Sequence, residues 1–176
     1  MPDLHPDVQG LAFLLGTWRG RGHGEYPTIE SFDYVEELTF SHVGDAFLVY
    51  EQRSWAPRDE APLHLEHGFY RFGQDGELEI TLAHPLGLVE IAHGRVTGSV
   101  VEANTDPGLM GRTRSGMDVI GIRRRYEVLA DRMTYRIDMA TERTPMALHL
   151  EGELRRTERP DPKRYVGESG EAAPVG

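Results

Sequence analysis

Histidine offers the main metal-binding and acid–base chemistry in this sequence of 176 residues, because the chain contains eight histidines and no cysteine. The lack of cysteine excludes disulfides, thiolate nucleophiles and Cys-bound zinc or iron–sulfur clusters. A bound metal or cofactor must therefore rely on histidine, carboxylate, methionine or backbone ligands. The histidines are His5, His23, His42, His64, His67, His84, His93 and His149.

The spacing of these histidines does not by itself identify a metal site. No His-Glu-x-x-His pair of the helical zinc type occurs. His64 and His67 lie three residues apart on an expected strand, so their side chains point to opposite faces and cannot bind one ion together without a bulge. The sequence also lacks a Gly-x-Ser-x-Gly nucleophile elbow and a phosphate-binding loop. Acidic pairs such as Glu36 and Glu37 occur in alternating segments, which favours a solvated strand face over acid–base catalysis.

The charge balance excludes several classes of partner. With 19 basic and 29 acidic residues, the formal net charge is −10, so most of the surface repels the phosphates of nucleic acids and anionic membranes. All basic residues except Lys163 are arginines, and arginine suits bidentate binding of anions. The N-terminus lacks a secretory signal pattern, and no apolar run reaches the ~20 residues of a membrane span. We expect a cytoplasmic protein without nucleic-acid or membrane partners.

Short alternating segments broken by Gly, Pro, Asn and Asp extend from about residue 16 to residue 156, a pattern typical of antiparallel strands joined by tight turns. The expected strands are Thr17–Gly22, Phe32–His42, Ala46–Trp55, Leu63–Phe72, Leu78–His84, Gly87–His93, Arg95–Glu102, Met117–Leu129, Arg132–Met139 and Pro145–Arg156. His93-Gly94 is an expected turn, and Thr105–Gly116 fits either a loop or a strand. About ten sequential strands predict an all-β, up-and-down antiparallel barrel like those of lipocalins and fatty-acid-binding proteins. A two-sheet sandwich is the alternative.

Segments at the two ends of the chain complete this picture. Asp7–Leu15 has apolar residues at helical spacing, which predicts a short N-terminal helix that plugs one end of the strands. Four glycines between residues 16 and 24 indicate tight bends or close approach of other groups, and Trp18 is expected to fill the closed end of the barrel. Residues 158–176 are polar and rich in Pro and Gly, so we expect a disordered tail behind a single domain of residues 1–157.

The glycine-rich opening resembles a known motif. Gly16-Thr17-Trp18-Arg19-Gly20-Arg21-Gly22 is similar to the Gly-x-Trp-x-Gly-x-Gly motif of the nitrobindin family, and Tyr26-Pro27-Thr28-Ile29 continues the match. Further segments similar to the family follow in the same order: Phe40–Gly44, Pro62–Phe69, Leu82–Gly87, Asp138–Ala140 and Pro145–Leu150. Because the resemblance extends from about residue 9 to residue 157, it is more specific than a single motif.

This resemblance implies a β-barrel that binds one ferric heme b per subunit, with His149 as both the iron ligand and the catalytic residue. It implies a heme-dependent peroxynitrite isomerase that converts peroxynitrite to nitrate and also binds nitric oxide, and it suggests a homodimer. With one neutral histidine ligand, the iron would keep an open sixth position for a small ligand.

Further cofactor-binding residues are implied by position within the same resemblance. These residues are Thr28, His64, His84 and Met139. The run Arg123-Arg124-Arg125 adds Arg124 as a further candidate, with an exposed basic strand as the alternative reading. We expect Thr28 and the guanidinium of Arg124 to contact the heme propionates, and the two histidines and the methionine to line the cavity. Relatives often have a lysine where this chain has Met117, so the propionate contacts are the least defined part of the expected site.

His149 lies in a segment whose pattern disagrees with a buried role. Strict alternation over Leu148–Leu154 puts the leucines on one face and His149 with two glutamates on the other, so the pattern alone predicts an exposed imidazole. A bulge or a strand end near Pro145 would turn this side chain toward a bound iron.

Two alternative functions use the same barrel. One is a heme or nitric oxide carrier or sensor without turnover, which kinetics with peroxynitrite would distinguish from the enzyme. The other is a lipocalin-like carrier of a different apolar ligand, which would show no Soret band after titration with hemin.

Overall fold

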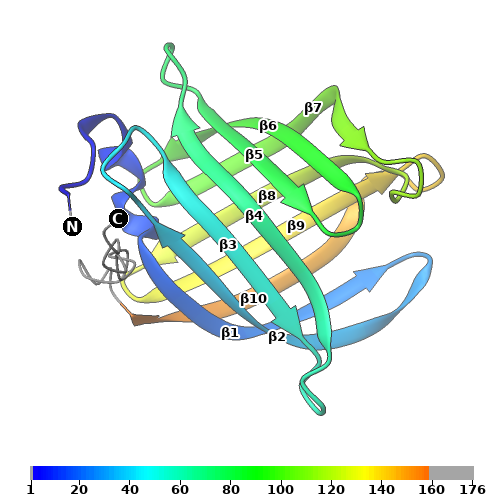
Figure 1. The fold of residues 1–176 in the computed structure, drawn as a ribbon. Coiled ribbons are helices and arrows are strands. Elements are labelled where there is room, and N and C mark those ends of the chain that lie inside the picture. The colour runs from blue at the N-terminus through cyan, green and yellow to red at the C-terminus, as the bar shows by residue number, and fades with distance from the viewer. Residues whose placement is uncertain (1, 159–176) are drawn as a thin grey trace, which may run out of the picture.

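The alternation of buried and exposed side chains produces ten strands in the computed structural model, which describes residues 2–158. The strands are β1 (Gly16–Tyr26), β2 (Ile29–Ser41), β3 (Leu48–Trp55), β4 (Pro62–Phe72), β5 (Leu78–His84), β6 (Leu88–Thr97), β7 (Val100–Arg112), β8 (Val119–Leu129), β9 (Arg132–Thr141) and β10 (Ala147–Glu158). Each strand pairs antiparallel with its neighbours in sequence, and β10 pairs with β1 to close the sheet (Figure 1). The predicted up-and-down barrel is confirmed, and the sandwich is excluded.

One hairpin lies in a different place from the prediction. The expected strand Arg95–Glu102 and the expected turn at His93-Gly94 are wrong, because β6 runs through both residues and reverses only at Gly98, whose φ is +60°. Gly94 is a strand glycine: a Cβ there would lie 2.0 Å from the carbonyl oxygen of Glu102 on β7. Positions 94 and 98 are both glycines, so the sequence alone does not show which of them lies in the hairpin turn. The pairing of β6 with β7 decides it. The ambiguous segment after residue 104 continues β7 as far as Arg112.

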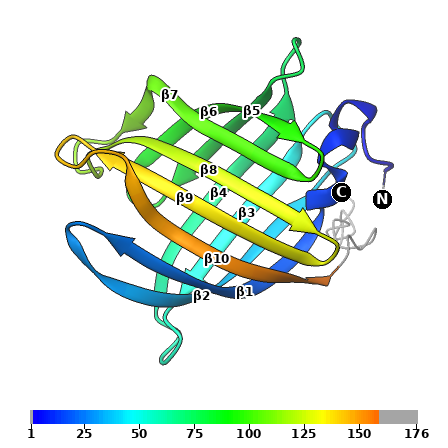
Figure 2. The same cartoon turned by 180° about the vertical axis from the view of Figure 1, so that it is seen from behind.

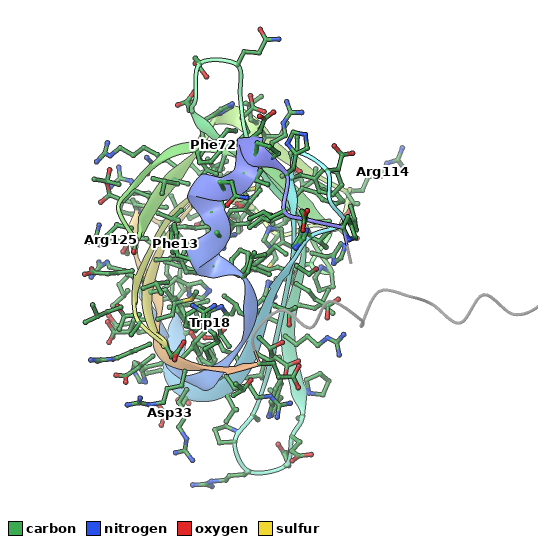
Figure 3. The ribbon with its side chains drawn as sticks, turned by 90° about the vertical axis from the view of Figure 1, so that its left-hand side faces the viewer. Phe13, Trp18, Asp33, Phe72, Arg114 and Arg125 are labelled. Carbon is green, nitrogen blue, oxygen red and sulfur yellow. The ribbon has the colours of Figure 1, made fainter. Side chains whose placement is uncertain are left out.

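A short helix covers one end of the barrel, as predicted. It is the 3₁₀ helix η1 (Pro6–Leu14), which lies across the barrel end in Figure 3. Its apolar side chains Val8, Leu11 and Leu14 are fully buried. Trp18 of β1 is also fully buried beneath the helix, and its Nε1 donates a hydrogen bond to the carbonyl oxygen of Leu14 at 2.7 Å. This end of the barrel is therefore closed.

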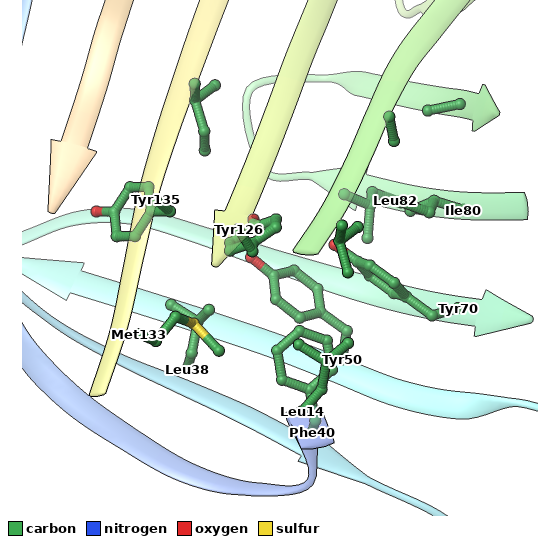
Figure 4. Packing of buried hydrophobic residues seen from close by; sticks show 14 of the residues in the cluster. Leu14, Leu38, Phe40, Tyr50, Tyr70, Ile80, Leu82, Tyr126, Met133 and Tyr135 are labelled. Carbon is green, nitrogen blue, oxygen red and sulfur yellow. The ribbon is translucent and has the colours of Figure 1, made fainter. Parts of the chain in front are cut away.

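The barrel interior next to η1 is a packed apolar and aromatic core. Figure 4 shows Leu14 of the helix next to Phe40 and Tyr50. The ring centroids of Phe40, Tyr50 and Tyr70 lie 5.0 to 5.3 Å apart, the spacing of attractive aromatic contacts. A filled core on this side leaves the opposite end as the place for a ligand.

The opposite end carries the loops that join β1 to β2, β5 to β6, β7 to β8 and β9 to β10 (Figures 1 and 2). Among the expected tail residues 158–176, Glu158 is still part of β10, and the others lie outside the described residues. Within the described part of the chain, no helix has the length and apolar character needed to cross a membrane.

Candidate functional site

One cavity of about 540 Å³ lies toward the open end of the barrel, within the range usual for cofactor sites. Its wall combines side chains from most of the strands with loop residues. All six residues that the sequence analysis suggested line this cavity: Thr28, His64, His84, Arg124, Met139 and His149. Much of the remaining wall is apolar: Ile29, Phe32, Leu63, Leu86, Leu88, Val119, Ile122, Ile137 and Leu150.

His149 reaches this cavity because β10 is irregular at that position. On β9, Asp138 pairs with Leu148 and Ile137 pairs with Leu150, so His149 is an extra residue in the ladder. Such a bulge interrupts alternation, and both His149 and Leu150 then line the cavity. The pattern-based expectation of an exposed imidazole is wrong, and the suggested bulge is present.

The neighbouring strand has a second irregularity opposite the first. The pairing of β1 with β2 shifts between Gly24 and Tyr26, which leaves Glu25 without a register partner. The carbonyl oxygen of Glu25 lies 3.3 Å from Nδ1 of His149. Since a carbonyl only accepts, Nδ1 is the donor, and the neutral imidazole keeps its lone pair on Nε2.

This arrangement prepares His149 to bind a metal. Burial lowers the pKa of His149 from its ordinary value of 6.5, while the hydrogen bond to Glu25 acts in the opposite direction. The imidazole is therefore neutral near pH 7, as a metal ligand must be. A ligating histidine commonly donates its other ring nitrogen to a carbonyl, which fixes the tautomer and the ring orientation.

Tyr26 fixes the imidazole from a second side. Its ring meets that of His149 edge to face, with centroids 5.5 Å apart. The Tyr26 hydroxyl donates to the carbonyl oxygen of Met139 at 3.3 Å, which ties β1 to β9 behind His149. The imidazole is thus held by one hydrogen bond and one aromatic contact.

The inner end of the cavity is polar and charged. Arg124 is almost fully buried and donates to the carboxylates of Glu66 and Glu90 at 2.7 to 3.2 Å. Burial alone would raise the pKa of Glu66, but the neighbouring Arg124, with His64 and His84, holds it well below its usual range. The guanidinium of Arg124 is therefore engaged by two carboxylates at the cavity floor.

His64 and His84 lie beside the same carboxylate. Nε2 of His64 and Nδ1 of His84 are each 3.5 Å from Oε1 of Glu66, and 3.4 Å from one another. Burial lowers the pKa of His84, and Glu66 partly offsets that effect. In contrast, His67 is half exposed on the outer face of β4, as the three-residue spacing predicted.

Exposed loop residues line the cavity mouth, and two of them, Thr28 and Arg143, can bind anions. Thr28 lies in the turn between β1 and β2, and Met117 is 42% exposed in the loop after β7. Arg143, in the loop between β9 and β10, is exposed and lines the same cavity. Its guanidinium lies in a loop at the mouth, whereas Arg124 is buried at the floor.

Sequence reasoning missed two residues of this site, Glu66 and Arg143, and misplaced Glu36, which is outside the cavity lining. Glu66 is two residues from His64 on one strand, so a shared inward face was predictable from the spacing. Arg143 had no comparable signal, because loop positions carry no periodicity. Glu36 was expected on a solvated face, which is wrong: it is 2% exposed and accepts a hydrogen bond from Gln52 at 3.3 Å. Its neighbour Glu37 faces outward and pairs with Arg19.

These features fit a heme. A neutral imidazole offers Nε2, the surrounding wall is largely apolar, and the mouth offers a hydroxyl and a guanidinium for propionates. A porphyrin needs an apolar cavity with one axial ligand and polar groups at its edge, and this cavity provides each of them.

Comparison with known proteins gives an independent result. The family described as "THAP4-like, heme-binding beta-barrel domain" matches residues 7–156. A protein named peroxynitrite isomerase 2 from Mycobacterium marinum is 46% identical over 88% of this chain and 97% of its own length. The peroxynitrite isomerase of Nocardia farcinica is 43% identical over 87% of this chain and 92% of its own length.

A solved structure agrees with the barrel and its topology. The crystal structure of Rv2717c from M. tuberculosis superposes with a TM-score of 0.80 at 40% identity, covering 88% of this chain and 99% of that one. The sequence resemblance, the closed ten-stranded barrel and the matched family thus agree over the same residues. The chain belongs to the THAP4-like heme-binding β-barrel family, the nitrobindin family.

Proposed function

We propose that this chain binds one ferric heme b per subunit through His149 and isomerises peroxynitrite to nitrate. The observation that carries the proposal is the imidazole of His149 in an apolar cavity, with Nδ1 bound to the Glu25 carbonyl and Nε2 left as the ligand atom. The names of relatives at 41 to 46% identity support the reaction.

The proposed reaction needs no acid–base pair from the protein. Peroxynitrite and nitrate have the same atoms and charge, so the O–O bond breaks and an N–O bond forms without an external proton or electron. A bound heme supplies an iron with one open coordination position, where a small anion can be activated. The tasks left to the chain are to hold the heme, orient it and limit access of water.

Specific residues perform those tasks in this proposal. His149 ligates the iron, and its orientation is fixed by Glu25 and Tyr26. Met139 provides apolar wall, while His64 and His84 line the inner part of the same cavity. The mouth residues Thr28 and Arg143 are proposed contacts of the propionates, and Arg124 lines the floor, where it pairs with Glu66 and Glu90.

The test is the decay of peroxynitrite in stopped flow, with the nitrate yield measured. Heme-loaded protein is expected to accelerate the decay and to increase the nitrate yield over buffer. The His149→Ala variant, supplied with the same amount of hemin, should lose most of that acceleration. Decay no faster than in buffer would exclude the enzyme and leave a heme carrier.

Nitric oxide binding is a further part of the proposal. The same open iron position that accepts peroxynitrite would accept nitric oxide, a small neutral ligand. Spectral titration of the heme-loaded protein with nitric oxide measures this affinity independently of turnover. A saturable shift of the Soret band is expected, and an unchanged spectrum would contradict it.

We also propose a homodimer, supported by an exposed apolar face on β4, β5 and β6. Phe69, Thr81 and Ile91 lie side by side across these strands, and Phe69, Ile91 and Val89 are 41 to 55% exposed. Self-complementary apolar faces are typical of two-fold dimers. Light scattering should find a dimer for the wild type and a monomer for Val89→Lys, and a monomeric wild type would exclude the dimer.

A further inference from the structure

Three side chains at the cavity floor have an arrangement that the heme does not explain. They are His64 and Glu66 of β4 and His84 of β5, and all three line the cavity. Among the side chains that the structure describes, they form the one group of three His, Asp or Glu residues whose ligand atoms all lie within 4.8 Å of one another.

The ligand atoms form a nearly equilateral triangle. Nε2 of His64 and Nδ1 of His84 are 3.4 Å apart, and each is 3.5 Å from Oε1 of Glu66. Good hydrogen bonds between such atoms are about 2.7–3.2 Å long, so these contacts are stretched. Three ligands of a tetrahedral ion with bonds of about 2.0–2.1 Å lie about 3.3–3.4 Å apart. The triangle therefore has the edge length of a tetrahedral metal site.

The local charge also favours a cation. Glu66 and Glu90 share the single guanidinium of Arg124, which leaves this buried group with a formal charge of −1. The side chains of Arg124 and Glu90 are at most 1% exposed and that of Glu66 is 8% exposed, so water compensates little of this charge. A buried charge without compensation is costly. The ring nitrogens of His64 and His84 lie beside this carboxylate, where a bound cation would balance the charge.

The triad lies on the wall opposite His149. In the closed barrel, β10 is separated from β4 by β1, β2 and β3 on one side, and from β5 by β6, β7, β8 and β9 on the other. The two sites therefore use different strands and share no ligand. Two histidines, one glutamate and an open fourth position form the ligand set of several catalytic zinc sites.

We propose that His64, Glu66 and His84 form a second metal site, separate from the heme, which binds one divalent transition-metal ion, with Zn²⁺ the best match. The site follows from the triangle of ligand atoms and from the buried negative charge. Its ligands are on β4 and β5 and His149 is on β10, so it shares no ligand with the heme iron.

The experiment measures Zn²⁺ binding to the full-length chain, heme-free and heme-loaded, by competition with a chromophoric chelator and by metal analysis. One zinc per chain is expected in the heme-free protein and one zinc per iron in the loaded protein. Co²⁺ in the heme-free protein should give the visible absorption intensity of a four-coordinate ion. Absence of stoichiometric zinc in the heme-free protein would overturn the proposal.

Variants locate the ion. His64→Ala should weaken Zn²⁺ binding by more than about 100-fold, since loss of outer-shell partners alone costs 10–100-fold in other sites. His64 is only partly buried, so this change leaves the core intact, and circular dichroism checks the fold. His67→Ala, on the outer face of the same strand, is the matched control and should bind as the wild type does. Equal affinity of His64→Ala and wild type would overturn the proposal.

A last variant separates this site from the heme. His149→Ala is expected to lose the Soret band and to retain its zinc. Loss of zinc in this variant would place the ion at His149 and contradict the second site. Retention of zinc together with a normal Soret band would contradict the heme ligand and leave the second site standing.

Discussion

At the scale of single residues, the environment of His149 separates it from the other histidines lining the cavity. His64 and His84 also line it, but both lie against the carboxylate of Glu66. Only His149 has its Nδ1 fixed by a backbone carbonyl, that of Glu25, within a largely apolar part of the wall. A histidine held in this way offers Nε2 without an attached negative charge, which suits a ligand of heme iron.

Replacement of His149 by alanine should remove heme ligation without unfolding the barrel, because the side chain lines a cavity and is not part of the packed core. Titration with hemin is expected to give a sharp Soret band in the wild type and only the broad absorbance of free hemin in His149→Ala. His67→Ala is the control and should behave as the wild type does. A full-intensity band in the alanine variant would mean that another residue binds the iron.

At the scale of elements, two irregular pairings build the site. The shift between β10 and β9 turns His149 toward the cavity, and the shift between β1 and β2 lies at Glu25, whose carbonyl contacts His149. Two glycines of β1, Gly22 and Gly24, leave room inside the barrel for aromatic rings of β2. A Cβ on Gly22 would lie 2.2 Å from the Tyr34 ring, and one on Gly24 would lie 2.3 Å from the Phe32 ring. The sequence suggested close approach of other groups to these glycines, and this is confirmed.

Gly22→Ala should therefore destabilise the protein by about 1–3 kcal/mol, the usual cost of adding atoms to a packed interior. The Tyr34 ring has to move, and its hydroxyl then loses its short contact with the hydroxyl of Tyr135. Urea unfolding of both proteins gives the free-energy difference. Gly121→Ala is the control, because the nearest atom to its Cβ is 3.6 Å away; equal losses in the two variants would contradict this explanation.

At the scale of the whole molecule, the barrel has one closed end and one end with a cavity. The helix η1 and Trp18 fill the closed end, and every loop with a side chain in the cavity lies at the other end. Stability and ligand binding therefore depend on different ends of the barrel, and changes at one end should leave the other intact.

Leu11→Ala tests this separation. Leu11 is fully buried between η1 and the core, so its truncation should cost about 2–5 kcal/mol in unfolding free energy. The affinity of the folded protein for hemin should change little, because the helix is remote from the cavity. Leu129→Ala, at a position 77% exposed, should change stability by less than about 0.5 kcal/mol. A large loss of hemin affinity in folded Leu11→Ala would show that the two ends are coupled.

The buried carboxyl of Glu36 should make the stability of the whole protein depend on pH. Burial raises the pKa of Glu36 from 4.5 to about 7, against the hydrogen bonds from Tyr135 and Gln52. The folded state therefore binds this proton more tightly than the unfolded state does. The resulting stability is fully present below pH 4.5 and is lost as the pH rises through about 7.

Over that pH window, Glu36 contributes on the order of 3 kcal/mol to the free energy of unfolding, since each unit of pKa shift corresponds to about 1.4 kcal/mol. Glu36→Gln removes the titrating group and keeps its size. Urea unfolding at pH 5 and pH 8 should show wild type losing stability relative to the variant at the higher pH. Parallel pH profiles for the two proteins would exclude Glu36 as the source.

The sequence by itself determined the number of strands, the up-and-down barrel, the plugging helix and the role of Trp18, because alternation, turn residues and helical spacing are local patterns. It also supplied the resemblance that pointed to His149. It placed one hairpin wrongly, since Gly94 and Gly98 differ only in what lies opposite them.

The tertiary structure alone decided how the site is built. Alternation assigns His149 to the outside, and a one-residue shift of pairing between β9 and β10 turns it inward. Glu25 supplies a carbonyl from 124 residues away in the chain, and Glu66, Glu90 and Arg124 meet only when the barrel closes. Register and charge pairing are properties of strands in contact, so a single strand's sequence does not contain them.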